Sequence, residues 1–324
     1  GGLGIVLSGP ILDHLSYHWL FWIPLIVVGI AAVLTMVVVP ESRHRAPGRI
    51  NWLGAAFLSA WLVALLLAVS EGRSWGWGSG RTLGLLAAAV VLAAAWIRVE
   101  DRTAMPLVDM KMMRLRGVWT TNLATVLIGF GMFSSFILVP QLVEMPASTG
   151  WGLGATVTEA GLYLVPSTLA MLLMGPVTGR IASSFGSKVP LVAGAAVCSV
   201  SFFLLAFAHR QPWEIYLGTA LMGVGIGLAF ASMANLIVEA VPREQTGVAS
   251  GMNTIMRSIG SSLGSQISAS IIAGSVVAST GLPGESGFTA AFAMCAGVLV
   301  VGTLAALAVP GHAARARQTA AASA

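Results

Sequence analysis

Residues 251–274 read GMNTIMRSIGSSLGSQISASIIAG and contain a single charge, Arg257. Small residues recur around that charge at intervals of four positions, as Gly260 and Gly264 do. Small residues at this spacing share one face of a helix and let two membrane helices approach closely. The segment therefore predicts a membrane helix that packs tightly against protein. It also raises the question of which group stabilises the charge of an arginine in so apolar a segment.

The rest of the chain has the composition of an integral membrane protein. Of its 324 residues, 56% are hydrophobic and 9% are charged, whereas soluble domains carry roughly 25% charged residues. We expect an all-α membrane protein. Residues 1–12 look like the second half of a helix, so we expect the chain to be a fragment of a longer protein. Nine further apolar segments are each about long enough for a helix to cross the ~30 Å hydrocarbon core, and they cover approximately residues 19–39, 52–70, 82–98, 118–141, 159–179, 189–208, 213–238, 248–277 and 288–309.

Lys and Arg are unevenly distributed between the connectors. Thirteen of the 17 fall in one alternating set of loops and the C-terminal tail, three fall in the other set, and Arg257 lies within a helix. Loops rich in Lys and Arg face the cytoplasm, so we expect a multi-pass protein of the cell membrane with a cytoplasmic C-terminus. The net charge of +5 does not indicate a nucleic-acid partner, because the basic residues are scattered between apolar segments.

The connectors divide the chain into four predicted units. Residues 1–40 hold the partial helix and one complete helix, and residues 41–116 hold a polar linker, two helices and a basic connector. Residues 117–310 form a block of six helices, a common repeat unit of secondary transporters, and residues 311–324 form a tail. Within the basic connector, PLVDMKMMRLR (106–116) favours a short helix that lies in the membrane interface.

The first of three motifs that resemble a known family is LGIVLSGPILDHLSYHWLFWI (3–23). It resembles the antiporter motif in the fifth helix of the major facilitator superfamily, with Gly4 and Gly9 at the small positions and Asp13 at the acidic position that follows. Ile5 replaces the family's proline. Small residues there let the helix press closely on a neighbour. Asp13 by itself is typical of a turn or a cap.

The second motif, GPVTGRIASSFGSK (175–188), resembles the cytoplasmic gating loop of the same superfamily. Glycines permit a tight reversal there, and basic residues keep the loop in the cytoplasm. Ser183 and Ser184 replace the family's Asp and Arg, so the charges of those two positions are absent. The motif residues assigned to gating are Gly179, Arg180, Gly186 and Lys188.

The third motif is the opening segment with its lead-in, VPREQTGVASGMNTIMRSIGSSLGS (241–265). It is similar to the thirteenth helix of the fourteen-helix drug:proton antiporters, a branch of the major facilitator superfamily. Taken in order, the three motifs make the chain resemble that branch from its fifth helix to its last. The matching positions are Gly247, Ala249, Gly251, Asn253, Arg257, Gly260 and Gly264.

The resemblance implies a proton-coupled secondary transporter that exports hydrophobic or cationic small molecules by alternating access. Its implied partners are the small-molecule substrate, protons and the lipid bilayer, and we expect a monomer without a cofactor. A selective metabolite exporter and a transport-inactive membrane fragment remain alternatives. An enzyme or a metal site is disfavoured, because the chain has no Cys-x-x-Cys and no His-Glu-x-x-His. Cys198 and Cys295 are predicted to be small core residues.

Two helices of the six-helix block carry the residues that suit a substrate cavity. Residues 118–141 form the most polar helix of the block, and residues 213–238 combine Met and Phe with an amide. The resemblance would make these two the central cavity helices of the block. Ordinary helix packing is the alternative for any single Met or Phe. The predicted lining residues are Asn122, Thr125, Ser135, Gln141, Phe230, Met233 and Asn235.

Two roles remain open for Arg257. Counting ~20 residues of hydrocarbon span back from position 278 reaches position 258, so we expect the arginine at the cytoplasmic boundary. There it either snorkels to the headgroups or lines the inner cavity and holds a gate closed, with Glu239 and Glu244 on the same face of the membrane. In the family, proton-coupling groups often belong to the first four helices, and no acidic residue lies deep within a complete span here.

Overall fold

The predicted all-α membrane fold is confirmed by the computed structural model of the chain. Its elements among the described residues are helices, and one isolated β-bridge joins Val276 to Pro283. Eight helices of the described part are long and apolar enough to cross a membrane. The described residues are 11, 15–38, 51–103, 106–242, 245–277 and 280–311.

The helices follow the predicted segments closely. α11 (Thr246–Gly274) has 29 residues and corresponds to the predicted span 248–277, but its many serines leave it less apolar than the eight candidate spans. Those eight are α2 (Trp19–Val38), α3 (Trp52–Trp75), α4 (Gly80–Arg102), α6 (Arg116–Glu144), α7 together with α8 (Val157–Phe185), α9 (Lys188–Phe207), α10 (Pro212–Ala240) and α12 (Glu285–Ala308).

The segment predicted as one helix over residues 159–179 is divided in two. α7 (Val157–Tyr163) ends at Leu164, and α8 (Val165–Phe185) begins with a proline in its first turn. Proline has no N–H to donate to the preceding turn, so the helical hydrogen bonding is interrupted there. Thr156 and Glu159 form a capping box that fixes the start of α7.

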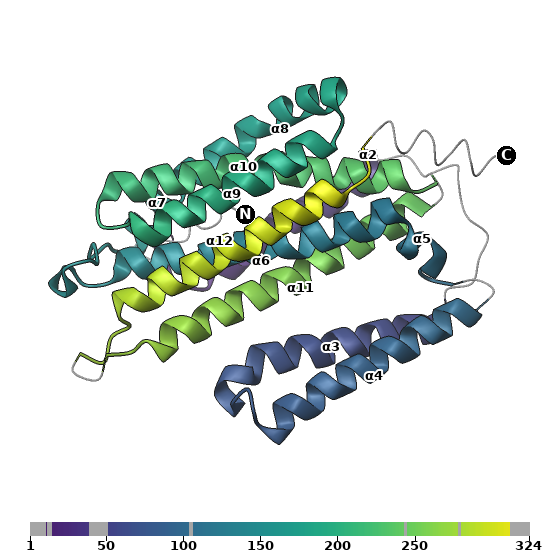
Figure 1. Cartoon of the computed structure of the whole chain (residues 1–324), viewed down its shortest axis with the longest axis horizontal. Helices are drawn as coiled ribbons and strands as arrows, with labels where there is room; N and C mark the ends of the chain where they lie inside the picture. The colour runs from purple at the N-terminus through teal and green to yellow at the C-terminus, as the bar shows by residue number, and fades with distance from the viewer. Residues whose placement is uncertain are drawn as a thin grey trace.

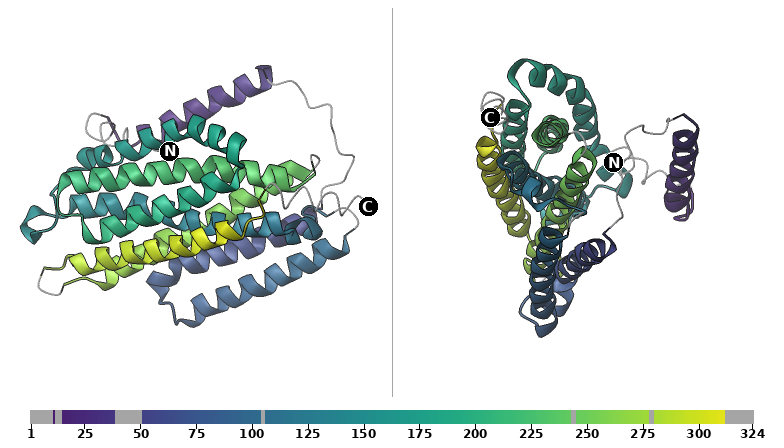
Figure 2. Two further views of the ribbon diagram at one scale, coloured as in Figure 1. Left: turned by 45° about the horizontal axis from the view of Figure 1, so that its top comes forward. Right: turned by 90° about the vertical axis from the view of Figure 1, so that its right-hand side faces the viewer.

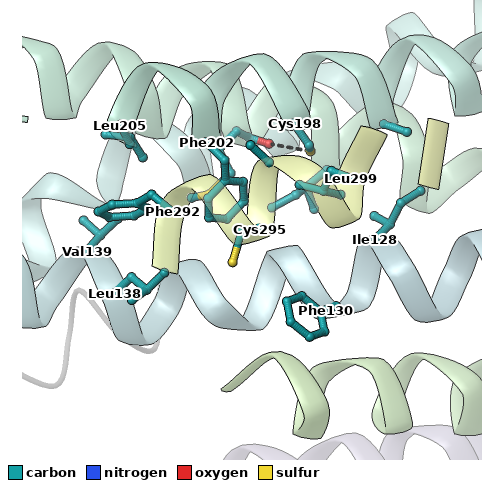
Figure 3. Close-up of a cluster of buried hydrophobic side chains, with 14 of the residues drawn as sticks. Ile128, Phe130, Leu138, Val139, Cys198, Phe202, Leu205, Phe292, Cys295 and Leu299 are labelled. Carbon is teal, nitrogen blue, oxygen red and sulfur yellow. Dashed lines mark hydrogen bonds between the residues drawn. The ribbon is translucent and has the colours of Figure 1, made fainter. Parts of the chain in front are cut away.

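Helices α6 to α12 form one block whose core is built mainly by α6, α9, α10 and α12 (Figure 1), and Figure 3 shows the part between α6, α9 and α12. Aromatic and aliphatic side chains from these helices pack against one another in the centre of the block. Cys198 and Cys295 are buried in this core as free thiols, as the sequence predicted. Its large members include Ile128, Leu138, Phe202, Phe292 and Leu299.

A helical hairpin, α3 with α4, lies beside α11 (Figure 1). Trp61 and Trp96 pack against each other with ring centroids 6.2 Å apart, and they join a second apolar cluster that includes Met252 of α11. The short helix predicted in the connector is present as α5 (Met110–Arg114), which is capped by Asp109 and buries two methionines in this cluster. The hairpin is thus attached to the six-helix block through α5 and α11.

α2 stands apart from the block (Figure 2), and none of its residues is buried. A helix that is apolar on all sides requires lipid or protein around it. The predicted division at residues 40, 116 and 310 stays a prediction, since residues 39–50 and 312–324 lie outside the described part.

Candidate functional site

The closest helix contact near the predicted site is the crossing of α6 and α11. A Cβ on Gly260 would meet the backbone carbonyl of Val126, and a Cβ on Gly264 would meet that of Phe130. Both glycines are buried, so a larger side chain at either position would force the two backbones apart. The four-residue spacing noted in the sequence therefore marks the face of α11 that lies against α6.

A buried amide cluster holds the same two helices together. The Asn253 side-chain amide of α11 donates to Asn122 Oδ1 at 2.9 Å and to Thr125 Oγ1 at 2.8 Å, and both acceptors belong to α6. The Thr125 hydroxyl donates in turn to the Thr121 carbonyl at 2.8 Å. The Asn122 amide nitrogen is buried without a hydrogen-bond partner among the described residues. Asn122 and Thr125, predicted as cavity residues, thus bond to α11.

One helical turn further along α11, Arg257 turns its charge toward the six-helix block. Its guanidinium carbon lies 4.6 Å from the centroid of the Phe230 ring on α10, and its backbone and Cγ lie against Gly129 of α6. Arg257 forms no hydrogen bond or ion pair with any residue that the structure describes. Of its two suggested partners, Glu239 accepts a hydrogen bond from Ser187 at 2.8 Å, and Glu244 lies outside the described residues.

Phe230 also lines an apolar cavity of about 350 Å³ between α6, α8 and α10. Each of the three helices contributes a pair of lining residues four positions apart. Such pairs could have been recognised from the sequence only if it were known which helices face one another. Sequence reasoning identified Phe230 and missed the other six lining residues. The lining consists of Met132 and Phe136 from α6, Met171 and Gly175 from α8, and Gly227, Phe230 and Ala231 from α10.

The other predicted cavity residues lie elsewhere in the block. Met233 is part of the main apolar core. Ser135 is buried and donates to the Met132 carbonyl at 2.5 Å, while Gln141 and Asn235 are exposed. Their assignment to a substrate path stays a prediction.

The predicted gating loop connects α8 to α9 and is bonded to two other helices. Gly186 ends α8 with a φ of +81°, a conformation that favours glycine. Lys188 Nζ donates to the Leu307 carbonyl at 2.7 Å and so caps the end of α12. Gly179 and Arg180 are exposed. The gating roles of these residues stay predictions, and the fifth-helix motif residues Gly4, Gly9 and Asp13 lie outside the described residues.

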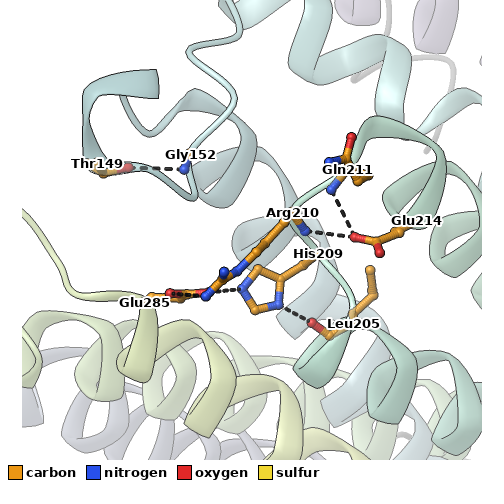
Figure 4. A network of polar contacts seen from close by, with 8 residues as sticks. All are labelled: Thr149, Gly152, Leu205, His209, Arg210, Gln211, Glu214 and Glu285. Atoms are coloured by element: carbon orange, nitrogen blue, oxygen red, sulfur yellow. Dashed lines mark hydrogen bonds and ion pairs between the residues drawn. The ribbon is translucent and has the colours of Figure 1, made fainter.

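A charged network that the sequence did not indicate joins the α9–α10 loop to α12 at the opposite end of the block (Figure 4). Arg210 makes a bidentate ion pair with Glu285, with nitrogen–oxygen distances of 3.0 and 3.2 Å. The buried His209 bonds through Nδ1 to the Leu205 carbonyl at 2.8 Å and places Nε2 3.4 Å from Glu285. Glu214 accepts from the Arg210 backbone at 2.8 Å. These contacts fix the loop against the start of α12.

The described residues contain no group of three or more His, Cys, Asp or Glu that could hold a metal ion.

A family model for the Major Facilitator Superfamily matches residues 1–265 of the chain. The chain belongs to this superfamily. The family and its all-α membrane fold indicate a transporter rather than an enzyme.

Curated relatives carry names that refer to drug resistance. The multidrug resistance protein Stp of Mycobacterium tuberculosis is 27% identical over 78% of this chain and 46% of that protein. The tetracenomycin C resistance and export protein of Streptomyces glaucescens is 28% identical over 77% of the chain and 46% of the relative. The multidrug transporter protein MdtP of Bacillus subtilis is 27% identical over 79% and 47%. The chain thus spans about half the length of these relatives.

Proposed function

We propose that the full-length protein is a proton-coupled secondary transporter of the cell membrane that exports hydrophobic small molecules by alternating access. The observation that carries this proposal is the apolar cavity between α6, α8 and α10 in a chain of the major facilitator superfamily. Its Met and Phe side chains adapt to ligands of different shape. The names of the relatives, which refer to multidrug resistance and export, support the same activity.

Proton coupling is proposed from the family resemblance. The seven lining residues of the cavity include no Asp or Glu, so the cavity itself offers no carboxylate to carry a proton. We assign proton binding to the part of the full-length protein outside the described residues. The protein is proposed to act as a monomer with its C-terminus in the cytoplasm, in keeping with the distribution of Lys and Arg.

The test is the accumulation of Nile Red, an uncharged hydrophobic dye, in cells that express the full-length protein. We expect less dye in these cells than in cells with an empty vector, and a protonophore should abolish the difference. Export that persists after the proton gradient collapses contradicts proton coupling. Equal accumulation in expressing and control cells, at verified expression in the membrane, contradicts export of hydrophobic compounds.

A further inference from the structure

We infer that the cavity between α6, α8 and α10 selects aromatic anions, and that Arg257 is the residue that binds the ligand's acidic group. This inference rests on the proposed export function and names the substrate class of the same site. It predicts a charge preference, which neither the family nor the names of the relatives supply.

The cavity and Arg257 share a wall. Phe230 lines the cavity, and the Arg257 guanidinium lies over the face of its ring. Arg257 also lies against Gly129, which is three positions before the lining residue Met132 on α6. Positions three apart are neighbours on one helix face. The arginine therefore sits about one helical turn from the cavity, toward the Arg116 end of α6.

The Arg257 guanidinium has unused hydrogen-bond donors. A guanidinium has five N–H groups that match the two oxygens of a carboxylate, and its contact with Phe230 occupies only the face of the group. No acceptor bonds to Arg257 among the residues that the structure describes. The Arg257 side chain is partly buried, and an unpaired charge away from water is unfavourable. An acidic ligand would supply the missing acceptor.

A cationic ligand would find no carboxylate in the cavity to pair with its charge, and Arg257 already lies over the Phe230 ring, whose face could otherwise attract a cation. The seven lining residues carry no charge, and the positive Arg257 contacts one of them, Phe230. An ammonium group placed in the cavity would be repelled by this like charge. The aromatic character follows from the lining itself, because Phe136, Phe230 and the two methionines offer ring and sulfur contacts to a flat ligand.

The test measures binding to the purified full-length protein of three probes that share one ring system. The probes are 2-naphthoate, the cation 2-naphthylmethylammonium and the neutral 2-naphthalenemethanol, and their dissociation constants are measured by equilibrium dialysis at pH 7. We expect naphthoate to bind at least about tenfold more tightly than the ammonium probe, because only the acid forms a charge-assisted bond with Arg257.

Variants assign the preference to its residue. Arg257→Gln should lower naphthoate affinity to that of the neutral alcohol while the alcohol's own affinity changes less than about twofold, since the substitution removes only the charge-assisted bond. Arg81→Gln, which removes an exposed arginine of α4, is the matched control and should leave all three affinities unchanged. Phe230→Leu should weaken all three probes, because they share the ring contact. Thermal unfolding of each variant verifies that it is folded.

Three results would overturn the inference. They are equal or tighter binding of the ammonium probe by the wild type, a preference for naphthoate that survives in a folded Arg257→Gln, and no binding of any probe by a protein that exports Nile Red. The comparison of naphthoate with the ammonium probe on the wild-type protein tests the charge preference even if Arg257→Gln does not fold. In each case Nile Red export remains a separate measurement, so failure of the charge preference is distinguished from failure of the export function.

Discussion

At the scale of single residues, Asn253 has the most specific contacts of the α6–α11 crossing. Its side-chain amide satisfies Asn122 and Thr125 together. Asn253→Ala leaves both acceptors buried without that donor, and hydrogen bonds between membrane helices contribute about 0.6 to 2 kcal/mol each. We predict a loss of about 1 to 3 kcal/mol in unfolding free energy, measured as a lower melting temperature of the purified full-length protein.

The control for this prediction is Ser258→Ala on the same helix. The Ser258 hydroxyl is exposed and bonds only to the Thr254 carbonyl within α11, so its removal should leave the melting temperature almost unchanged. Equal effects of the two substitutions would show that the amide cluster does not stabilise the crossing.

Arg257 illustrates what a single residue in a sequence does and does not predict. Counting along the span placed it near a membrane boundary, because helix rise and bilayer thickness are fixed quantities. The same count does not give the rotation of α11 about its axis. That rotation is set by the contacts of Gly260 and Gly264 with α6, and it turns the arginine toward Phe230.

At the scale of elements, glycines of α11 that look alike in sequence differ in their surroundings. A Cβ at position 260 would meet the Val126 carbonyl, whereas a Cβ at position 251 has no atom within 4 Å. We predict that Gly260→Ala destabilises the protein by about 1 to 3 kcal/mol through overpacking. Gly251→Ala should be neutral or stabilising by up to about 1 kcal/mol, because alanine favours the helix.

Both variants are compared with the wild type by thermal unfolding in the same detergent. The difference between them isolates the helix contact, since residue type, helix and size of the change are identical. A melting temperature that falls equally in both would contradict the close crossing of α6 and α11.

Helix number and type were largely predictable, because long apolar segments separated by polar connectors have few other folds. The break at Leu164 was not predicted, although Pro166 is visible in the sequence. Prolines also occur inside unbroken helices here, as Pro140 does in α6. Whether a proline ends a helix depends on the neighbours that satisfy the freed carbonyl groups, and these are not local in sequence. The cavity was incompletely predicted for the same reason, since its residues come from three helices.

At the scale of the whole molecule, the orientation in the membrane is the prediction most open to test. Cys198 and Cys295 are buried, so a cysteine introduced on the surface dominates labelling by an impermeant maleimide. Gly78→Cys lies in the turn between α3 and α4, and Ser184→Cys lies near the end of α8, both at exposed positions. With a cytoplasmic C-terminus, intact cells should label position 78 and leave position 184 unlabelled until they are permeabilised.

The reverse labelling pattern would contradict the proposed orientation, and labelling of both positions in intact cells would contradict their placement on opposite sides. The unsubstituted protein is the control for background at the two native cysteines.

Export through the cavity between α6, α8 and α10 requires that the exported molecule occupies that cavity, and filling the cavity tests this most directly. Ala231 lines the cavity, whereas Ala234, three residues later on α10, is exposed outside it. The measurement is Nile Red accumulation in energised cells that express equal amounts of the full-length wild type, Ala231→Phe or Ala234→Phe. We predict that Ala231→Phe raises accumulation to the empty-vector level and that Ala234→Phe matches the wild type. Wild-type export by Ala231→Phe would contradict the claim.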